Sequence, residues 1–171
     1  KGSGLAMDER SRLRLLPNRP AHNCFGCSPS NPYGLRLQFY AGTDSVVTWI
    51  TVPAHLCGWD TLVHGGILAT ILDEVMGRVV IFQLKSLLLT KSMTVDFLKP
   101  LFVGVELKAE ARVVEVRNGR EAVAEGGIYN AAGELCTKSS GTFVLVDSGT
   151  AKRKGLADDE FMRWFDDLFR S

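Results

Sequence analysis

The sequence predicts an α+β fold in which a curved antiparallel sheet wraps around one long central helix. Apolar residues first follow the period of strands, then the period of a helix, and then return to strand-like runs that continue to residue 146. Asn-Gly and Ala-Gly pairs separate two of the later runs, as at hairpin turns. With 171 residues the chain has the length of one compact domain, and the single apolar helix gives the sheet a surface to pack against.

Two strands are expected before the helix. Residues 35–39 alternate apolar and polar side chains, which is the pattern of a half-buried strand. Residues 45–52 are rich in Val, Thr, Trp and Ile, the residue types enriched in strands. We expect the two strands to be joined at Ala41-Gly42.

The long helix is predicted over residues 63–80. Its apolar side chains recur every three or four positions and form one broad face. They are Ile67, Leu68, Ile71, Leu72, Val75, Met76 and Val79. This helix is the expected centre of the fold.

Four further strands are predicted after the helix. They cover residues 89–98, 103–117, 121–129 and 134–146. Asn118-Gly119 and Ala132-Gly133 lie at two of the joins, and Asn-Gly favours a type I′ turn because both central residues need positive φ. We therefore expect an antiparallel meander.

The chain divides into four parts on this basis. Residues 1–6 are typical of an expression scar and are excluded from the fold. Residues 7–33 are rich in Pro, Asn, Ser and Gly and predict an irregular or short helical lead-in. The main domain is expected at residues 34–146, followed by a linker and C-terminal helix at residues 147–171.

The C-terminal helix is predicted to be amphipathic. Asp158 or Asp159 is placed to cap its start, and residues 147–155 form the polar linker before it. Its aromatic and aliphatic stripe consists of Phe161, Trp164, Phe165, Leu168 and Phe169. This stripe is expected to pack on its own domain or on a partner subunit rather than on a membrane.

Composition excludes several classes of protein. A formal net charge of +1 lacks the broad positive field of a nucleic-acid or anionic-membrane binder. The most apolar stretch, residues 79–89, is too short to span a bilayer of about 30 Å. No export signal follows the first six residues, so we expect a soluble, cytoplasmic protein.

The four cysteines are expected to be free thiols in a reducing compartment. Cys24 and Cys27 have a spacing that also occurs in zinc sites, and His22, Cys57 or Cys136 would be the further ligands. A structural zinc site usually shows a second ligand pair with matching spacing, and none is present. We therefore expect no metal, and interpret Cys57 and Cys136 as buried apolar residues.

The start of the long helix is the first candidate site. It carries His64-Gly65-Gly66, although glycine costs about 1 kcal/mol relative to alanine inside a helix. The first amide groups of a helix have no intrahelical acceptor and lie at the positive end of the helix dipole. Two glycines there leave these donors uncovered, as in an oxyanion hole.

Asp73 is the candidate catalytic carboxylate. At about 100° per residue it lies on the side of the helix opposite the apolar face. The other positions on that side are small: Gly66, Ala69, Thr70 and Gly77. Such a face predicts that another backbone, a subunit or a ligand lies against it. Glu74 is the rival carboxylate, but an ion pair with Arg78 explains it more simply.

Several motifs of this sequence occur in one family of proteins. They are His64-Gly65-Gly66, Asp73-Glu74, Thr90, Val95 through Pro100, and, in the lead-in, Asn23 through Leu35. Together they resemble the hotdog-fold acyl-CoA thioesterases of the PaaI type over residues 23–146. The predicted order of strands and helix agrees with that fold.

The resemblance implies hydrolysis of acyl-CoA thioesters at a dimer interface, without a metal, prosthetic group or other cofactor. It implies that the amide of Gly65 polarises the thioester carbonyl and that His64 helps to position it. Asp73 of the facing subunit would activate water or attack directly. Thr90 matches a Ser or Thr that orients water or substrate in relatives.

One segment departs from the family pattern. Where some relatives carry Asn or Gln before the helix, this chain has Gly58-Trp59-Asp60.

Relatives bind the anionic end of CoA with basic residues and backbone near a hairpin, and Arg suits phosphate because it donates paired hydrogen bonds. The expected substrate-binding residues are Gly66, Lys91, Arg117, Asn118, Gly119 and Arg120, with Lys138 as a further candidate.

The family resemblance implies a homodimer at least, with a homotetramer as the other frequent state.

Two other functions remain open at this point. The fold also hosts acyl-CoA-binding modules without turnover and dehydratases acting on hydroxyacyl or enoyl thioesters. A purely structural domain would leave the glycines at the helix start and the small-residue face unexplained.

Overall fold

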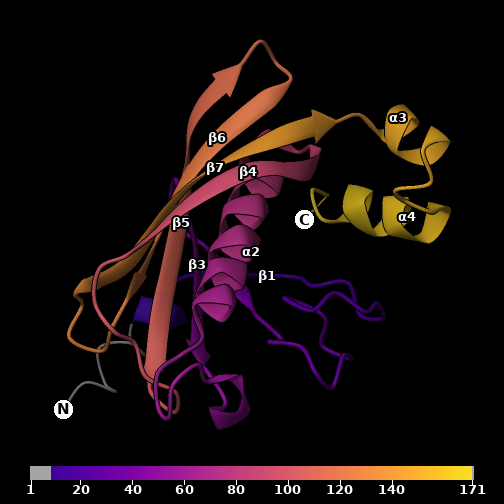
Figure 1. The fold of residues 1–171 in the computed structure, drawn as a ribbon. Coiled ribbons are helices and arrows are strands. Elements are labelled where there is room, and N and C mark those ends of the chain that lie inside the picture. The colour runs from indigo at the N-terminus through magenta and orange to yellow at the C-terminus, as the bar shows by residue number, and fades with distance from the viewer. Residues whose placement is uncertain (1–8, 171) are drawn as a thin grey trace.

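The computed structural model describes residues 9–170, in which a long helix lies against one face of an antiparallel sheet and two short helices follow near the chain end (Figure 1). The predicted expression scar and the start of the lead-in lie outside the described residues. The elements are β1 (Arg14–Leu16), β2 (Phe39–Ala41), β3 (Val46–Thr51), η1 (Ala54–Leu56), α2 (Gly65–Leu84), β4 (Leu87–Phe97), β5 (Glu106–Arg117), β6 (Glu121–Tyr129), β7 (Leu135–Val146), α3 (Ser148–Arg153) and α4 (Asp159–Asp167). The predicted α+β class with one central helix is confirmed.

The sheet departs from the predicted meander at one strand. Its order over the described residues is β1-β2-β3-β5-β6-β7-β4. Strands β5, β6 and β7 form the expected meander, but β4 pairs with β7, from Leu87 opposite Val146 to Phe97 opposite Thr137. The correction matters for function because β4 becomes an edge strand with one row of unpaired backbone groups.

The alternating pattern at residues 35–39 predicted a strand there, but β2 begins only at Phe39. Leu35 and Leu37 are buried as expected, yet regular pairing with β3 begins only at Phe39. The backbone N–H of Leu35 donates to the carbonyl of Phe25 at 2.8 Å, and that of Leu37 donates to Gly26 at 3.0 Å. This segment therefore pairs with the lead-in instead of lengthening β2.

Helix α2 lies close against the sheet because small residues face it. Ala109, Ala111, Ala122 and Ala124 are buried on β5 and β6. A Cβ added at Gly126 or Gly141 would come within 3.2 Å of the Met76 side chain. The helix buries its apolar face in this hollow, as predicted, and ends at Lys85, which adopts the left-handed conformation with φ of 51°.

Both ends of the chain contain elements that the sequence did not predict. Strand β1, inside the predicted lead-in, pairs with β2 and extends the sheet. Helix α3 forms within the predicted polar linker, capped by Asp147, which accepts from the N–H of Thr150. Helix α4 is confirmed, with Asp158 as its cap, and packs beside the start of β4 through Met162 and Phe165.

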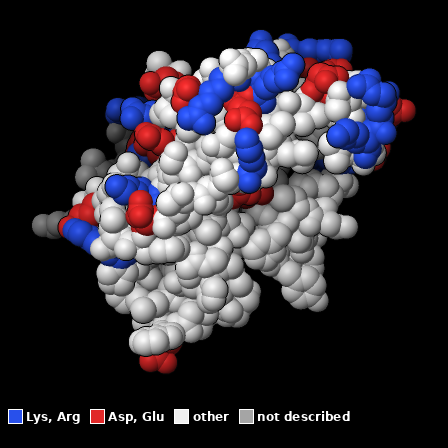
Figure 2. All heavy atoms as spheres, turned by 45° about the horizontal axis from the view of Figure 1, so that its top comes forward, with Lys and Arg blue, Asp and Glu red and all other residues white. Residues whose placement is uncertain are grey.

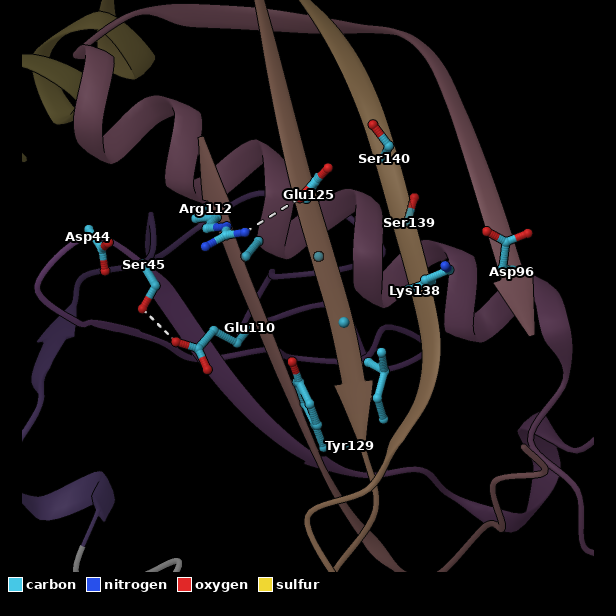
Figure 3. A pocket seen from close by; sticks show the side chains of 14 residues that line it. Asp44, Ser45, Asp96, Glu110, Arg112, Glu125, Tyr129, Lys138, Ser139 and Ser140 are labelled. Atoms are coloured by element: carbon cyan, nitrogen blue, oxygen red, sulfur yellow. Dashed lines mark hydrogen bonds and ion pairs between the residues drawn. The ribbon is translucent and has the colours of Figure 1, made fainter. Parts of the chain in front are cut away.

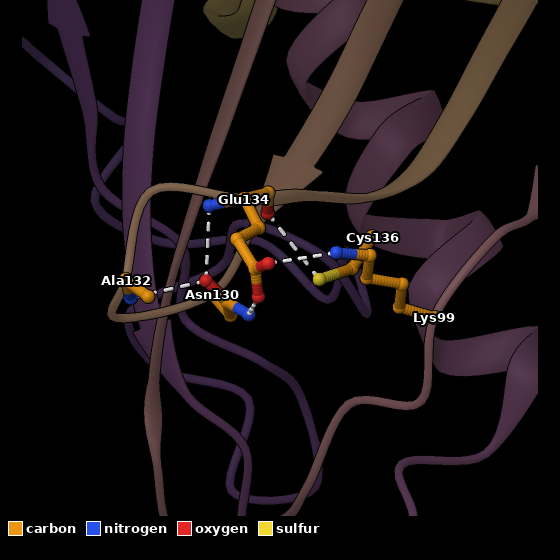
Figure 4. A network of polar contacts seen from close by, with 5 residues as sticks. All are labelled: Lys99, Asn130, Ala132, Glu134 and Cys136. Carbon is orange, nitrogen blue, oxygen red and sulfur yellow. Dashed lines mark hydrogen bonds and ion pairs between the residues drawn. The ribbon is translucent and has the colours of Figure 1, made fainter.

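The two predicted turns both form. Asn118 and Gly119 have φ of 51° and 63°, as a type I′ turn requires. At the other turn, Glu134 accepts from Lys99 at 2.7 Å and from Asn130 at 2.8 Å (Figure 4). This network fastens the segment after β4 to the β6–β7 turn, above the buried thiol of Cys136.

We expect Asp158→Ala to lower the free energy of unfolding by about 1 kcal/mol, because Asp158 accepts from the N–H of Phe161 at 2.7 Å and caps α4. Urea denaturation followed by circular dichroism measures the change. Asp166→Ala is the matched control, since it removes the same charge from the same helix near its C-terminal end. An equal loss of stability in both variants would contradict the assignment of the cap.

Candidate active site at the central helix

The start of α2 is built by His64. Its Nδ1 accepts from the backbone N–H of Gly66 at 2.9 Å, so His64 is the N-cap of the helix. The carbonyl of His64 accepts from Ile67 at 2.9 Å and from Leu68 at 3.2 Å. Gly66 was predicted to bind substrate, but its backbone N–H already donates to His64 and is not free to donate to a ligand.

Gly65 keeps a free backbone donor. Its N–H finds no acceptor in the described part of the chain, and it lies at the positive end of the helix dipole. The ring of Phe97, 56% exposed, lies beside it, with Cζ 3.4 Å from the position of an added Cβ. Trp59, Leu98 and Phe102 are also exposed around this end of the helix, so an apolar surface surrounds the free donor.

Asp73 and Thr90, both named as candidate catalytic residues from the sequence, lie next to each other. The Thr90 hydroxyl donates to Oδ1 of Asp73 at 2.8 Å, linking the middle of α2 to edge strand β4. Asp73 is half-buried, on a face whose neighbours Ala69 and Thr70 are also only half-buried. The predicted small-residue face is therefore present, and a part of it is open to solvent in one chain.

One chain does not bring Gly65 and Asp73 to the same point. Eight residues separate them on a regular helix, which corresponds to about 12 Å at 1.5 Å per residue. Thr90 joins Asp73, whereas His64 and Phe97 belong to the Gly65 end. The predicted catalytic residues thus form two half-sites.

The segment Gly58-Trp59-Asp60, where the family pattern is broken, forms a tight turn. Asp60 has φ of 41°, and the N–H of Leu62 donates to the carbonyl of Trp59 at 2.7 Å. A Cβ at Gly58 would lie 3.5 Å from Cα of His64. This turn therefore supports the cap residue from behind and leaves the Trp59 ring 83% exposed.

The predicted basic residues lie around the β5–β6 turn and the adjacent part of β4. Lys91 pairs with Glu121 at 2.6 Å, and Arg117 with Glu115 at 2.9 Å. Arg120 makes no ion pair with the described residues. Figure 2 shows charges of both signs gathered over the end of the molecule that is uppermost in Figure 1, while the surface below carries few.

A hollow of about 660 Å³ is lined by residues of β4, β5, β6 and β7. Asp96, Lys138 and Ser140 point into it from β4 and β7 (Figure 3). Two of its other charges are paired across the sheet, as Arg112 lies 3.8 Å from Glu125. None of the predicted catalytic residues lines it, and the candidate Lys138 belongs to this hollow rather than to the α2 site.

The predicted ion pair between Glu74 and Arg78 is not formed. Arg78 is buried and donates to Oδ1 of Asn18 at 2.8 Å, not to Glu74. Glu74 instead accepts from Sγ of Cys24 at 3.4 Å, across 50 positions of sequence. Desolvation by burial raises the pKa of Glu74 to about 7. The spacing of Cys24 and Cys27 was the only sequence signal for this cluster.

Cys57 also differs from its prediction. Cys136 is fully buried, as expected of an apolar residue, but Cys57 is half-buried and forms an isolated bridge with Val63. All four cysteines are free thiols in the structure.

Among the helices of the described residues, none has the length and hydrophobicity of a membrane-spanning segment.

Comparison with known proteins agrees with this geometry. Residues 61–137 match the sequence profile of the thioesterase superfamily. These residues include the N-cap, the free amide, the Asp73–Thr90 pair and the β5–β6 turn. No significant match was found among curated protein sequences.

Solved structures show the same fold. A protein described as a thioesterase superfamily protein superposes with a TM-score of 0.68 at 21% identity, covering 83% of this chain and 74% of its own. The E. coli PaaI protein from the phenylacetic acid degradation operon has a TM-score of 0.61 at 23% identity, covering 66% and 81%. A hypothetical thioesterase from Streptococcus pneumoniae, crystallised with coenzyme A, has 0.56 at 22% identity, covering 60% and 79%. Residues 61–137 are therefore similar to the thioesterase superfamily, and the chain has the hotdog fold.

Proposed function

We propose that this protein hydrolyses acyl-CoA thioesters at sites formed between two copies of the chain. The observation that carries the proposal is the Asp73–Thr90 hydrogen bond at 2.8 Å on a half-open face of α2. The free N–H of Gly65 supplies the second group that the chemistry requires. The similarity of residues 61–137 to the thioesterase superfamily supports this reaction class.

The reaction needs few groups. In one route, Asp73 removes a proton from a water molecule, and this water attacks the thioester carbonyl. In the other route, the Asp73 carboxylate attacks the carbonyl itself and forms an anhydride, which water then hydrolyses. The N–H of Gly65 donates to the oxyanion that forms in either case. CoA leaves as a thiolate, a good leaving group, so no Ser-His-Asp triad is needed. Thr90 orients Asp73.

A second copy is required because the two half-sites lie about 12 Å apart on one rigid helix. Edge strand β4 offers the pairing surface. If two β4 strands pair antiparallel about Met93 and Thr94, Thr90 of one copy lies opposite Phe97 of the other. Because Phe97 contacts Gly65, this register brings Asp73 of one copy toward the free amide of its partner.

The substrate class follows from the surroundings of these groups. Exposed Trp59, Phe97 and Phe102 at the helix start provide an apolar surface for an acyl group. Arg120, without an ion-pair partner in the described residues, and the turn at Asn118-Gly119 are the groups best placed for the phosphates of CoA. The similar thioesterase fold from Streptococcus pneumoniae was crystallised with coenzyme A, which supports this choice.

We expect Asp73→Asn to lower kcat for acyl-CoA hydrolysis at least about 100-fold, because the amide cannot act as base or nucleophile. Release of CoA thiol from short, medium, long and aromatic acyl-CoAs is the measurement. Asp96→Asn, an exposed acid that lines the hollow on the sheet, is the control and keeps full activity. Binding of acyl-CoA without CoA release by the native chain would instead identify a binding module.

His64 is expected to act through the helix cap. His64→Ala removes the acceptor for Gly66 and lowers the free energy of unfolding by about 1 kcal/mol, whereas His64→Asn keeps a side-chain acceptor and restores it. Urea denaturation measures both variants. If activity follows stability across the pair, His64 positions the Gly65 amide. Full loss of activity in a stable His64→Asn variant would show direct contact with the substrate.

The shared site predicts complementation between two inactive variants. Gly65→Pro removes the donor, yet proline is favoured at the first position of a helix, and His64 is already extended with ψ of 133°. We expect it to fold and to lose activity about 100- to 1000-fold. Unfolding and refolding it together with Asp73→Asn creates mixed dimers with one intact site.

Such a mixture should regain about one quarter of native activity, because half of its dimers are mixed and each holds one native site. Refolding either variant alone is the control and restores nothing. A mixture as inactive as its parents would place both groups of each site in one chain and refute the dimeric arrangement.

A further inference from the structure

The turn at Cys24–Cys27 brings together side chains that can bind a metal ion. One ligand atom from each of His22, Cys24 and Cys27 lies within 4.8 Å of the other two. Ligands around tetrahedral zinc, at 2.0–2.3 Å from the ion, are separated by roughly 3.3–3.8 Å. A contraction of about 1 Å therefore converts this cluster into a zinc-binding geometry.

The imidazole of His22 is available as a ligand. Its Nδ1 faces the turn, where it accepts only a long hydrogen bond from the backbone N–H of Cys24 at 3.3 Å. Its Nε2 is buried without a hydrogen-bond partner among the described residues.

Glu74 is the candidate fourth donor, and it lies outside the group in which His22, Cys24 and Cys27 fall within 4.8 Å of one another. Its Oε1 lies 3.4 Å from Sγ of Cys24. A Cβ added at Gly26 would lie 2.2 Å from Cγ and Cδ of Glu74, so the turn closes around this carboxylate only with glycine at that position. The close approach explains the glycine between the cysteines.

The charges around the cluster balance those of a bound zinc ion. Two thiolates and one carboxylate carry three negative charges, and Zn²⁺ supplies two positive ones. Arg78, which is buried, supplies the remaining positive charge. Asn18 links it to the turn, accepting from Arg78 at 2.8 Å and donating to the carbonyl of Cys27 at 3.1 Å.

The backbone of the turn is held in place before any ion binds. The buried hydroxyl of Ser28 donates to the carbonyl of His22 at 2.5 Å. Leu35 and Leu37 donate to the carbonyls of Phe25 and Gly26. A held backbone leaves only side-chain rotation as the cost of closing around a metal.

We propose that His22, Cys24, Cys27 and Glu74 form a structural zinc site that fastens the lead-in to helix α2. This site replaces the second ligand pair that the sequence lacks with a histidine upstream and a carboxylate from the helix. Binding releases the remaining thiol protons to solvent as zinc–sulfur bonds form. The inference is independent of the proposed hydrolysis, since none of its residues belongs to either half-site.

Zinc content tests the proposal directly. We expect the native chain, purified in the presence of zinc and then dialysed, to retain about one zinc per chain by elemental analysis. Cys27→Ser and Cys24→Ser should retain less than about 0.1 zinc per chain, and Glu74→Gln should bind zinc about 10- to 100-fold more weakly. Cys57→Ser, a half-buried thiol outside the cluster, is the matched control and keeps its zinc.

A measurement on the native chain covers the case in which a cysteine variant fails to fold. Cobalt added to the chelator-treated protein should produce the thiolate-to-cobalt charge-transfer band and the visible bands of tetrahedral cobalt, and zinc should abolish both. Removal of zinc should lower Tm. A dialysed native chain with less than about 0.1 zinc and no cobalt charge-transfer band would overturn the proposal. Loss of zinc from Cys57→Ser would do the same.

Discussion

The close fit of helix α2 into the hollow of the sheet is the contact on which the rest of the structure depends. Small residues on β5, β6 and β7 make it possible, because a Cβ at Gly126 or Gly141 would press on Met76. The packing fixes both the position and the rotation of the helix. One of its sides then faces the core, one carries Asp73, and its N-terminus opens beside Phe97.

A rigid helix also explains why the chemistry is divided. Its free amides occur only in the first turn, whereas Asp73 must lie near Thr90 on β4 to be held. No rotation of side chains closes about 12 Å along the axis. In the proposed dimer, two-fold symmetry would pair the amide of each copy with the carboxylate of the other through one edge-to-edge contact, and so would form two equivalent sites.

Local pattern predicted most of the fold, and contacts distant in sequence account for the differences. The period of apolar residues located α2, and the turn Asn118-Gly119 was recognisable because its backbone demands positive φ. The pairing of β4 with β7 was not recognisable, since strand order depends on chain crossing rather than on any local signal. The family pattern named Asp73 and Thr90 as candidates, but it predicted neither their hydrogen bond nor the contact of Cys24 with Glu74.

Asp73 and Glu74 illustrate how one helical turn serves two environments. Adjacent residues on a helix point about 100° apart, so one carboxylate reaches Thr90 on β4 while the other reaches Cys24 in the lead-in. Burial raises the pKa of Glu74, whose hydrogen-bond donor is the thiol of Cys24. Its carboxylate lies so close to Gly26 that an added Cβ there would fall 2.2 Å from Cδ of Glu74. The proposed zinc site rests on this contact between the helix and the lead-in, while the positive charge of Arg78, which donates to Asn18, acts on the pKa of Glu74 in the direction opposite to burial.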